Sequence, residues 1–401
     1  MLHRLLPLFC IITFILAACS GTSSPGPPAN HNQVINPALL QSSAGNDWPD
    51  FAFDSGHTGS AAPQRNSSPI HGKLLWSKKL GPIFSSPVAG LHMFYIASTD
   101  GYLYALQQDT GAQVWRTSLK NQLTDSTPTL EGQVLFVAMR GNNLAALNAL
   151  TGQIYWTFPT GEKIQAPPLA VGMRVLVASR TTLWTLDAST GHLLWKYHVG
   201  LDSWPSTGSP TVAGETVYIG LGSSTKFWAL DLASGHMRWT FDTKDRMMST
   251  ALTQDGTVYI ATWHGTIFAL NSATGQQSWS YALNANQGQQ PAEGVGGSMA
   301  LAHGLLFVGD YRGNLSCLDA VRGKLKWRFP TGAQILATPV VSGNLTYIGS
   351  GNGNFYALNM QTGRPSWSYP TGEIRGSAAL ANGRLFVGSL GGKAGELYAF
   401  V

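Results

Sequence analysis

From residue 73 onward, short runs of alternating hydrophobic and polar positions are separated by Gly, Asn and Asp. Residues 337–370 show one full unit, which reads ATPVV, LTYIGS, NFYALNM and PSWSYP, with turns at Gly343, Gly351–Gly353 and Thr362–Gly363. Period-two alternation bounded by such turns is typical of antiparallel strands joined as hairpins. The pattern therefore predicts four strands in each unit.

The unit recurs at intervals of 39 to 48 residues. Its core reads G-x-L-Y-A-L-x-x-x-T-G-x-x-x-W, and GYLYALQQDTGAQVW is the first of seven copies. A period near 40 built only from strands predicts a β-propeller and excludes a helical solenoid. The tryptophans that end the units are Trp76, Trp115, Trp156, Trp195, Trp239, Trp279, Trp327 and Trp367.

The two ends of the repeat region complement each other. GELYAF at residues 395–400 completes three inner strands, whereas GKLLWSKKL at residues 72–80 supplies an outer strand alone. Pairing the two removes the free edges of an open array. The expected fold is therefore all-β: an eight-bladed propeller of four-stranded antiparallel blades at residues 73–401, closed by the N- and C-terminal strands.

The repeat resembles the pyrroloquinoline-quinone (PQQ)-type repeat, A-x-D-x-x-T-G-x-x-x-W, over residues 73–401. This resemblance implies a propeller like that of quinoprotein alcohol dehydrogenases. It also implies that each tryptophan packs on the neighbouring blade and that the Thr-Gly turn bonds back to it. Proteins with this repeat include quinone-dependent dehydrogenases and cofactor-free lipoproteins of the BamB type, which act in outer-membrane β-barrel assembly.

The N-terminal residues resemble a bacterial lipoprotein signal. A basic start and an apolar run at residues 1–18 lead to Leu16-Ala17-Ala18-Cys19, which predicts lipidation of Cys19. An ordinary signal peptide or a plain membrane anchor is the alternative. Residues 19–45 are rich in Ser, Gly and Pro, which predicts a flexible tether. Residues 46–72 form a lead-in segment, and its first part, NDWPDFAFDSGHTGSA at residues 46–61, is expected to lie along the outside of the closing blade.

The composition of the chain limits the kinds of partner and the location that we expect. Charged residues make up 11% of the chain, well below the usual quarter or so, and the net charge is +5. No cluster of Lys and Arg is present, so nucleic acid is not an expected partner. Cys317 is expected in a core strand, and no disulfide framework is available. The chain is expected to be a monomeric propeller, outside the cytoplasm and lipid-anchored to a bacterial membrane.

Catalytic chemistry finds little support. Among proteins that this repeat resembles, the quinone-dependent dehydrogenases have adjacent cysteines, a Ca²⁺ held by Glu and Asn, and a catalytic Asp. If the chain were such an enzyme, the resemblance would imply the same features here. The chain has no adjacent cysteines, no carboxylate cluster and no H-x-x-x-H or H-E-x-x-H motif. Glu293, in a long insertion, is the one carboxylate of interest, and it also suits a solvated loop. We expect no catalytic residue, no metal and no cofactor.

Recognition is the remaining class of function. Several bulky side chains interrupt the small-residue turns between the second and third strands, and aromatic and Arg residues are common interface anchors. Packing inside the funnel is the alternative role for them. The predicted partner-binding residues are Arg140, Arg180, Trp263, His264, Asp310, Tyr311 and Arg312.

The leading functional hypothesis is a non-enzymatic, membrane-anchored lipoprotein that acts as a scaffold for another envelope protein. A PQQ-dependent dehydrogenase and an extracytoplasmic sensor or carbohydrate-binding propeller are the alternatives. A role in barrel assembly requires a host with an outer membrane. In a host with one membrane, the same features predict only an anchored propeller.

Overall fold

The computed structural model describes residues 33–41, 48, 52, 54–60, 70–119, 126–139, 142–199, 208–221, 223–283, 294–391 and 395–401. The chain divides into two compact units, Met1–Asn30 and His31–Val401, and all of the described residues belong to the second. Cys19, Arg140 and Glu293 lie outside the described residues.

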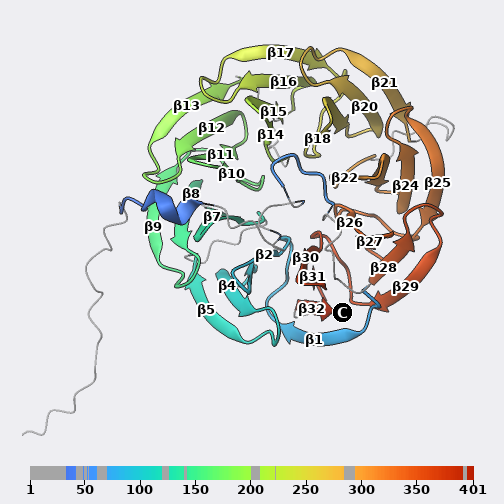
Figure 1. Ribbon diagram of the computed structural model, residues 1–401, viewed down its shortest axis with the longest axis horizontal. Coiled ribbons are helices and arrows are strands. Elements are labelled where there is room, and N and C mark those ends of the chain that lie inside the picture. Colours follow the sequence, from blue (N-terminus) through green and yellow to red (C-terminus); the bar gives the residue numbers. More distant parts are fainter. Residues whose placement is uncertain are drawn as a thin grey trace, which may run out of the picture. The chain divides into compact units, whose positions relative to one another are not determined.

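The second unit contains eight four-stranded antiparallel sheets, which form the blades of a ring (Figure 1). Blades one to four are β2(Val88–Gly90), β3(Met93–Ala97), β4(Tyr102–Gln107), β5(Gln113–Ser118); β6(Thr129–Glu131), β7(Val134–Met139), β8(Asn143–Asn148), β9(Ile154–Pro159); β10(Leu169–Val171), β11(Arg174–Ala178), β12(Thr182–Asp187), β13(Leu193–His198); and β14(Thr211–Ala213), β15(Thr216–Gly220), β16(Lys226–Asp231), β17(Met237–Asp242). Blades five to eight are β18(Leu252–Gln254), β19(Thr257–Ala261), β20(Thr266–Asn271), β21(Gln277–Ala282); β22(Met299–Ala302), β23(Leu305–Gly309), β24(Asn314–Asp319), β25(Lys324–Pro330); β26(Val340–Ser342), β27(Leu345–Gly349), β28(Asn354–Asn359), β29(Pro365–Pro370); and β30(Ala379–Ala381), β31(Arg384–Ser389), β32(Glu396–Phe400), β1(Leu74–Lys79).

The ring closes by pairing the two ends of the repeat region. β1 is the outer strand of blade eight and runs antiparallel to β32, with Trp76 opposite Ala399. Figure 1 shows the two strands side by side, β1 in blue and β32 in red. The predicted eight-bladed fold and its closure are confirmed.

Differences in burial explain why the strands of a blade have different patterns of hydrophobic and polar residues. β27 is buried at all five positions because its two faces pack against neighbouring blades. The outer strand β29 alternates exposed and half-buried residues, as expected for a strand with one face in solvent. A one-residue register shift at Ala357/Leu358 sets Trp367 opposite the small Ala357. The same shift recurs between the third and fourth strands of the other repeats, for example at Ala105/Leu106.

The repeat tryptophans join each blade to the next. Trp156 donates its indole N–H to the carbonyl oxygen of Ala188 at 3.2 Å, and the turn glycine Gly191 lies against the same ring. All eight follow this arrangement, which confirms the expected docking. The indole donors and their carbonyl acceptors are Trp76–Gln108, Trp115–Ala149, Trp156–Ala188, Trp195–Leu232, Trp239–Ser272, Trp279–Ala320, Trp327–Met360 and Trp367–Ile70.

Residues 54–60, which precede the repeats, lie in the central channel. The main chain of residues 48 and 55–59 bonds to the inner strands of five blades, so the expectation that residues 46–61 lie along the outside of the closing blade is wrong for their described part. Figure 1 shows residues 54–60 in blue at the middle of the ring. An inner strand exposes one row of unpaired N–H and C=O groups to the channel, and any extended backbone can satisfy them. The contacts are Trp48–Ala89, Ser55–Val212, Gly56–Thr253, Thr58–Leu301 and Gly59–Val341.

Residues 33–41, which we expected in the flexible tether, instead pack on blades two and three. The 3-10 helix η1 (Pro37–Leu40) follows Asn36, whose side chain accepts a hydrogen bond from the Ala38 N–H. Ile35 and Leu40 are 1% and 2% exposed and belong to the same buried cluster as Trp156. The additional cover leaves Trp156 only 1% exposed.

Candidate functional site

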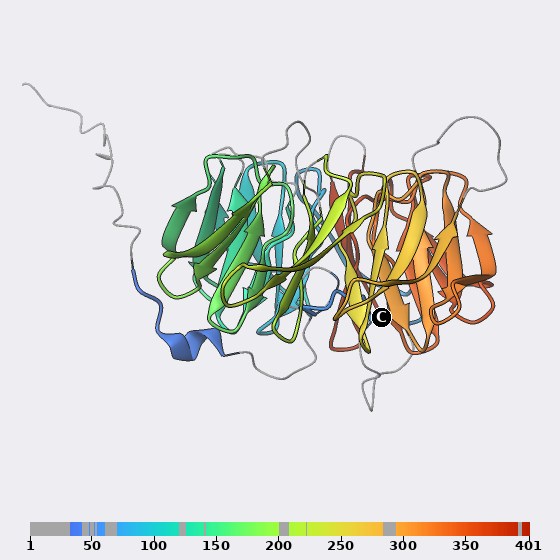
Figure 2. The same cartoon turned by 90° about the horizontal axis from the view of Figure 1, so that it is seen from above.

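The two faces of the ring carry different connections (Figure 2). We define the loop face as the one formed by the hairpins between second and third strands and by the connections between blades. The turn face carries the other two hairpins of each blade, and residues 33–41 pack there, where the Gln133 N–H donates to the carbonyl of Leu39. The described hairpins of the loop face include residues 98–101, 179–182, 262–265, 310–313 and 350–353.

The predicted partner-binding residues that the structure describes all lie in hairpins of the loop face. Arg180 is exposed on blade three. Trp263 and the exposed His264 lie on blade five, whereas Tyr311 and Arg312 lie half-buried on blade six. The structure therefore brings the predicted residues of blades five and six together, and it leaves Arg180 apart from them.

An aromatic cluster spans blades five and six. The rings of Trp263 and Tyr311 meet edge to face, with centroids 5.3 Å apart. The guanidinium of Arg246 lies 4.5 Å from the centroid of the Trp263 ring, a cation–π contact. We call Arg246, Trp263 and Tyr311 the loop-face cluster. All three side chains are half-buried, so each still presents surface to solvent.

Arg246 was not among the residues expected from the sequence. It lies in the connection DTKDRMM, where the equivalent connections of blades three, seven and eight begin with Pro-Thr-Gly. This departure from the repeat is the signal that could have identified the connection. Its contact with Trp263 could not be read from the sequence, because it depends on how the connection folds over the hairpin.

Main-chain hydrogen bonds hold the loop-face cluster in place. Trp263 donates its N–H to the carbonyl of Arg246 at 2.8 Å and accepts at its own carbonyl from the Gly294 N–H at 2.5 Å. The Tyr311 N–H donates to the carbonyl of Gly294 at 3.0 Å, so one residue ties both hairpins. Gly296 lies under the Tyr311 ring, where an added Cβ would come within 2.4 Å. The two rings are therefore positioned before any partner arrives.

His264 and Asp310 have local partners. Asp245 accepts hydrogen bonds from the His264 N–H at 2.8 Å and pairs with its Nδ1 at 2.9 Å. Asp310 is fully buried, and its Oδ1 accepts from the Asn314 N–H at 2.8 Å. Its carboxylate therefore fixes the 310–313 hairpin and is not displayed on the surface.

A carboxylate also organises the hairpin that carries Arg180. Glu162 accepts hydrogen bonds from the Thr181 N–H at 3.0 Å and from the hydroxyls of Ser179, Thr181 and Thr182. Burial opposes ionisation, but these hydrogen bonds outweigh it and hold the pKa of Glu162 below its usual value. Glu162 is therefore a structural anion near neutral pH and is not suited to donate a proton.

A ring of hydroxyl side chains surrounds the channel near the loop face. One or two residues before the inner strand, seven of the eight blades carry Ser or Thr, and most of these hydroxyls accept the N–H of the equivalent residue in the preceding blade. We call this ring the hydroxyl girdle. Its donor–acceptor pairs are Ser86–Thr127, Ser209–Thr250, Thr250–Ser298, Ser298–Thr338, Thr338–Ser377 and Ser377–Ser86, at 2.8–3.2 Å.

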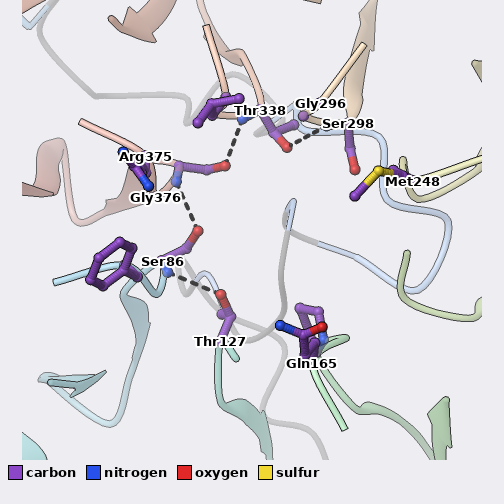
Figure 3. Close-up of a pocket in the computed structure, with 14 residues that line it drawn as sticks. Ser86, Thr127, Gln165, Met248, Gly296, Ser298, Thr338, Arg375 and Gly376 are labelled. Atoms are coloured by element: carbon purple, nitrogen blue, oxygen red, sulfur yellow. Dashed lines mark hydrogen bonds between the residues drawn. The ribbon is translucent and has the colours of Figure 1, made fainter. Parts of the chain in front are cut away.

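The girdle borders a cavity of about 190 Å³ (Figure 3). Small-molecule sites usually enclose roughly 300–1,000 Å³. Arg375 is the one charged side chain among the described residues that line this cavity, and Glu373 pairs with it at 2.7 Å. The cavity is thus small, and hydroxyl side chains of the girdle line part of its wall.

The described residues do not fit a Ca²⁺–quinone centre. Calcium takes six to eight oxygen ligands, usually including carboxylates. The described lining of the cavity includes no carboxylate, and no group of three His, Cys, Asp or Glu residues is placed to hold a metal within the described ranges. Cys317, in β24, is buried, and burial raises the pKa of its thiol to about 12. It is therefore an unreactive core residue.

A closed ring of eight blades, docked through the tryptophan of every repeat, defines a PQQ-type β-propeller. Two relatives of this chain carry names that describe different functions. Over 187 residues, the chain is 29% identical to the dehydrogenase subunit of the quinone alcohol dehydrogenase of Acetobacter aceti, covering 44% of this chain and 21% of that one. Over 143 residues, it is 32% identical to outer membrane protein assembly factor BamB of Burkholderia pseudomallei, covering 31% and 38%.

The family is decided by a match along most of the repeat region. The pattern of outer membrane protein assembly factor BamB matches residues 67–157, 99–240, 200–292 and 282–400, and the chain belongs to this family. The chain spans less than two fifths of either relative. The quinohemoprotein alcohol dehydrogenase of Comamonas testosteroni superposes with a TM-score of 0.76 at 15% identity, over 91% of this chain and 83% of that one. That likeness concerns the fold alone.

Within the described ranges, no helix is long and apolar enough to cross a membrane.

Proposed function

We propose that this protein is a non-enzymatic scaffold that binds another protein of the bacterial envelope through the loop face at blades five and six. The observation that carries the proposal is the loop-face cluster. Trp263 and Tyr311 lie outside the register of the docking tryptophans, so joining the blades does not account for them. Rigid aromatic rings beside a guanidinium are typical of the residues that dominate protein interfaces.

The location of the protein is part of the same proposal. The Leu16–Cys19 signal supports lipidation at Cys19, and the family name supports a role at the outer membrane. Residues 33–41 pack on the turn face. Residues 33–41 therefore do not cover the loop face, where we place the partner.

The test compares a loop-face variant with a core variant. Truncating a true interface anchor costs about 2 kcal/mol or more, which corresponds to roughly 30-fold weaker binding. We expect Trp263→Ala combined with Arg312→Ala to weaken capture of the membrane partner at least this much, with little change in melting temperature. Trp156→Ala should lower the melting temperature while its folded fraction still captures the partner. Full capture by the loop-face variant at wild-type stability would show that the site lies elsewhere.

A quinone-dependent dehydrogenase is the second candidate, favoured by the 29% identity to the dehydrogenase subunit. The donor set around the cavity argues against it, because calcium has no described carboxylate to bind. We expect no saturable binding of pyrroloquinoline quinone with Ca²⁺ by calorimetry and no dye-linked alcohol oxidation after reconstitution. Either activity would refute the scaffold proposal.

A further inference from the structure

The hydroxyl girdle is interrupted at one blade. At the girdle position, blade three carries Pro167, which has neither a hydroxyl to accept a hydrogen bond nor an N–H to donate one. Two steps of the ring are therefore lost, from blade two to blade three and from blade three to blade four. Ser209 compensates for the second by donating its hydroxyl to the carbonyl of Pro167 at 2.9 Å.

The first step is not compensated. The Thr127 N–H, which would donate to a hydroxyl at position 167, has no acceptor within the described part of the chain. Thr127 is 3% exposed, so its N–H is held away from bulk solvent. An unmet buried donor costs about 1–3 kcal/mol unless water or a ligand satisfies it.

Further donors without a protein acceptor lie at the same place. The Thr127 hydroxyl accepts from the Ser86 N–H, and in the described structure it donates to no acceptor. The side-chain amide of Gln165 forms no hydrogen bond with any described residue. Figure 3 shows Gln165 beside Thr127 at the edge of the cavity, and Pro167 lines the same wall.

The polar groups and the charge of the cavity lining indicate which kind of ligand would bind there. Backbone N–H, hydroxyl and amide groups point to a hydrogen-bond acceptor. The one charged residue of the described lining, Arg375, is positive, although its pairing with Glu373 moderates the field. A carboxylate accepts at both oxygens and forms stronger, charge-assisted hydrogen bonds. A metal cation would find no anionic ligand in the described lining.

We propose that the gap in the girdle at Pro167 is a binding site for the carboxylate of a small organic anion, held by the N–H and hydroxyl of Thr127 and the amide of Gln165. None of the residues that would hold the carboxylate belongs to the loop-face cluster, so the proposal does not depend on the proposed partner. The cavity volume of about 190 Å³ restricts the ligand to a small molecule.

The test is to close the gap. Pro167→Ser supplies a hydroxyl for the Thr127 N–H and an N–H for Ser209, as in the other blades. Titration of the full chain with succinate, followed by calorimetry, should show saturable binding by the wild type and at least tenfold weaker binding by Pro167→Ser. Pro168→Ala is the matched control, since blades five and eight carry Ala at that position, and it should bind as the wild type does.

A second variant covers the case in which Pro167→Ser fails to fold. Gln165→Leu removes an amide that forms no hydrogen bond with a described residue, so the fold should persist while succinate binding weakens. In crystals grown with succinate, a carboxylate should lie within hydrogen-bond distance of the Thr127 nitrogen. Absence of saturable binding by the wild type, or equal binding by the wild type and Pro167→Ser, overturns the proposal. Partner capture is measured separately, and neither result decides the other.

Discussion

At the scale of single residues, the turn glycines combine two constraints that can be separated. Gly191 has a φ of +72°, and a Cβ there would lie 2.7 Å from the Trp156 ring. Gly172 has a φ of +57°, with nothing within 4 Å of the same position. Both glycines therefore occupy the left-handed region, but only Gly191 also needs the absence of a side chain.

We expect Gly172→Ala to cost about 1–2 kcal/mol, the price of a left-handed backbone. Gly191→Ala should cost about 1–3 kcal/mol more, because it also displaces the docked indole. Urea unfolding of the two variants measures both quantities. Equal destabilisation of the two would mean that the ring moves aside freely and that the docking contact is loose.

The residues that repeat were predictable, and those that do not repeat were only partly so. The eight tryptophans and their glycines follow the period of the chain, so position alone indicates their role. The sequence indicated Asp310 as a binding residue, but it is buried, and its carboxylate accepts a hydrogen bond from the Asn314 N–H. A hairpin residue can point outward or back into its own turn, and only the folded backbone decides which.

At the scale of elements, the strands could be predicted and the lead-in segment could not. Each strand has an alternating pattern that reports which of its faces is buried. Residues 54–60 bind through main-chain groups, which every residue possesses, so no sequence pattern marks their partners. The hydroxyl girdle was readable in principle, since a Ser or Thr recurs before seven of the eight inner strands, yet its hydrogen bonds join different blades and become visible only in the ring.

The closing strand β32 is the element whose loss should affect the whole ring. Truncation before Gly395 removes the partner of β1 and the side chain of Phe400, which is fully buried. Loss of one buried Phe side chain typically costs about 3–5 kcal/mol, so the strand should contribute more. Calorimetry should show one transition at a lower temperature for the truncated chain.

The control for this truncation is a peptide of residues 395–401 added in trans. It can pair with the exposed edges of β1 and β31, as an extended peptide adds to a sheet. We expect it to raise the melting temperature of the truncated chain in a concentration-dependent way. Unchanged stability after truncation would indicate that the ring does not depend on closure.

At the scale of the whole molecule, the proposed attachment to a membrane depends on one residue. Cys19→Ser removes the thiol proposed to receive the lipid, so we expect the variant to incorporate no labelled fatty acid and to retain its signal segment. Cys317→Ser is the control, because that thiol is buried in β24 and should not affect labelling. Labelling of the Cys19 variant, or recovery of the wild type as a free secreted protein, would contradict the lipoprotein assignment.

Ring closure also sets the order in which the molecule can fold. β1 pairs with β32, and Trp367 donates to Ile70, a separation of 297 residues along the chain. Contacts between such distant residues slow folding, because a long loop must close before they form. Blade eight cannot assemble until β32 is available to pair with β1. The other seven blades are each built from consecutive strands, so blade eight is the one whose completion waits for both ends of the repeat region.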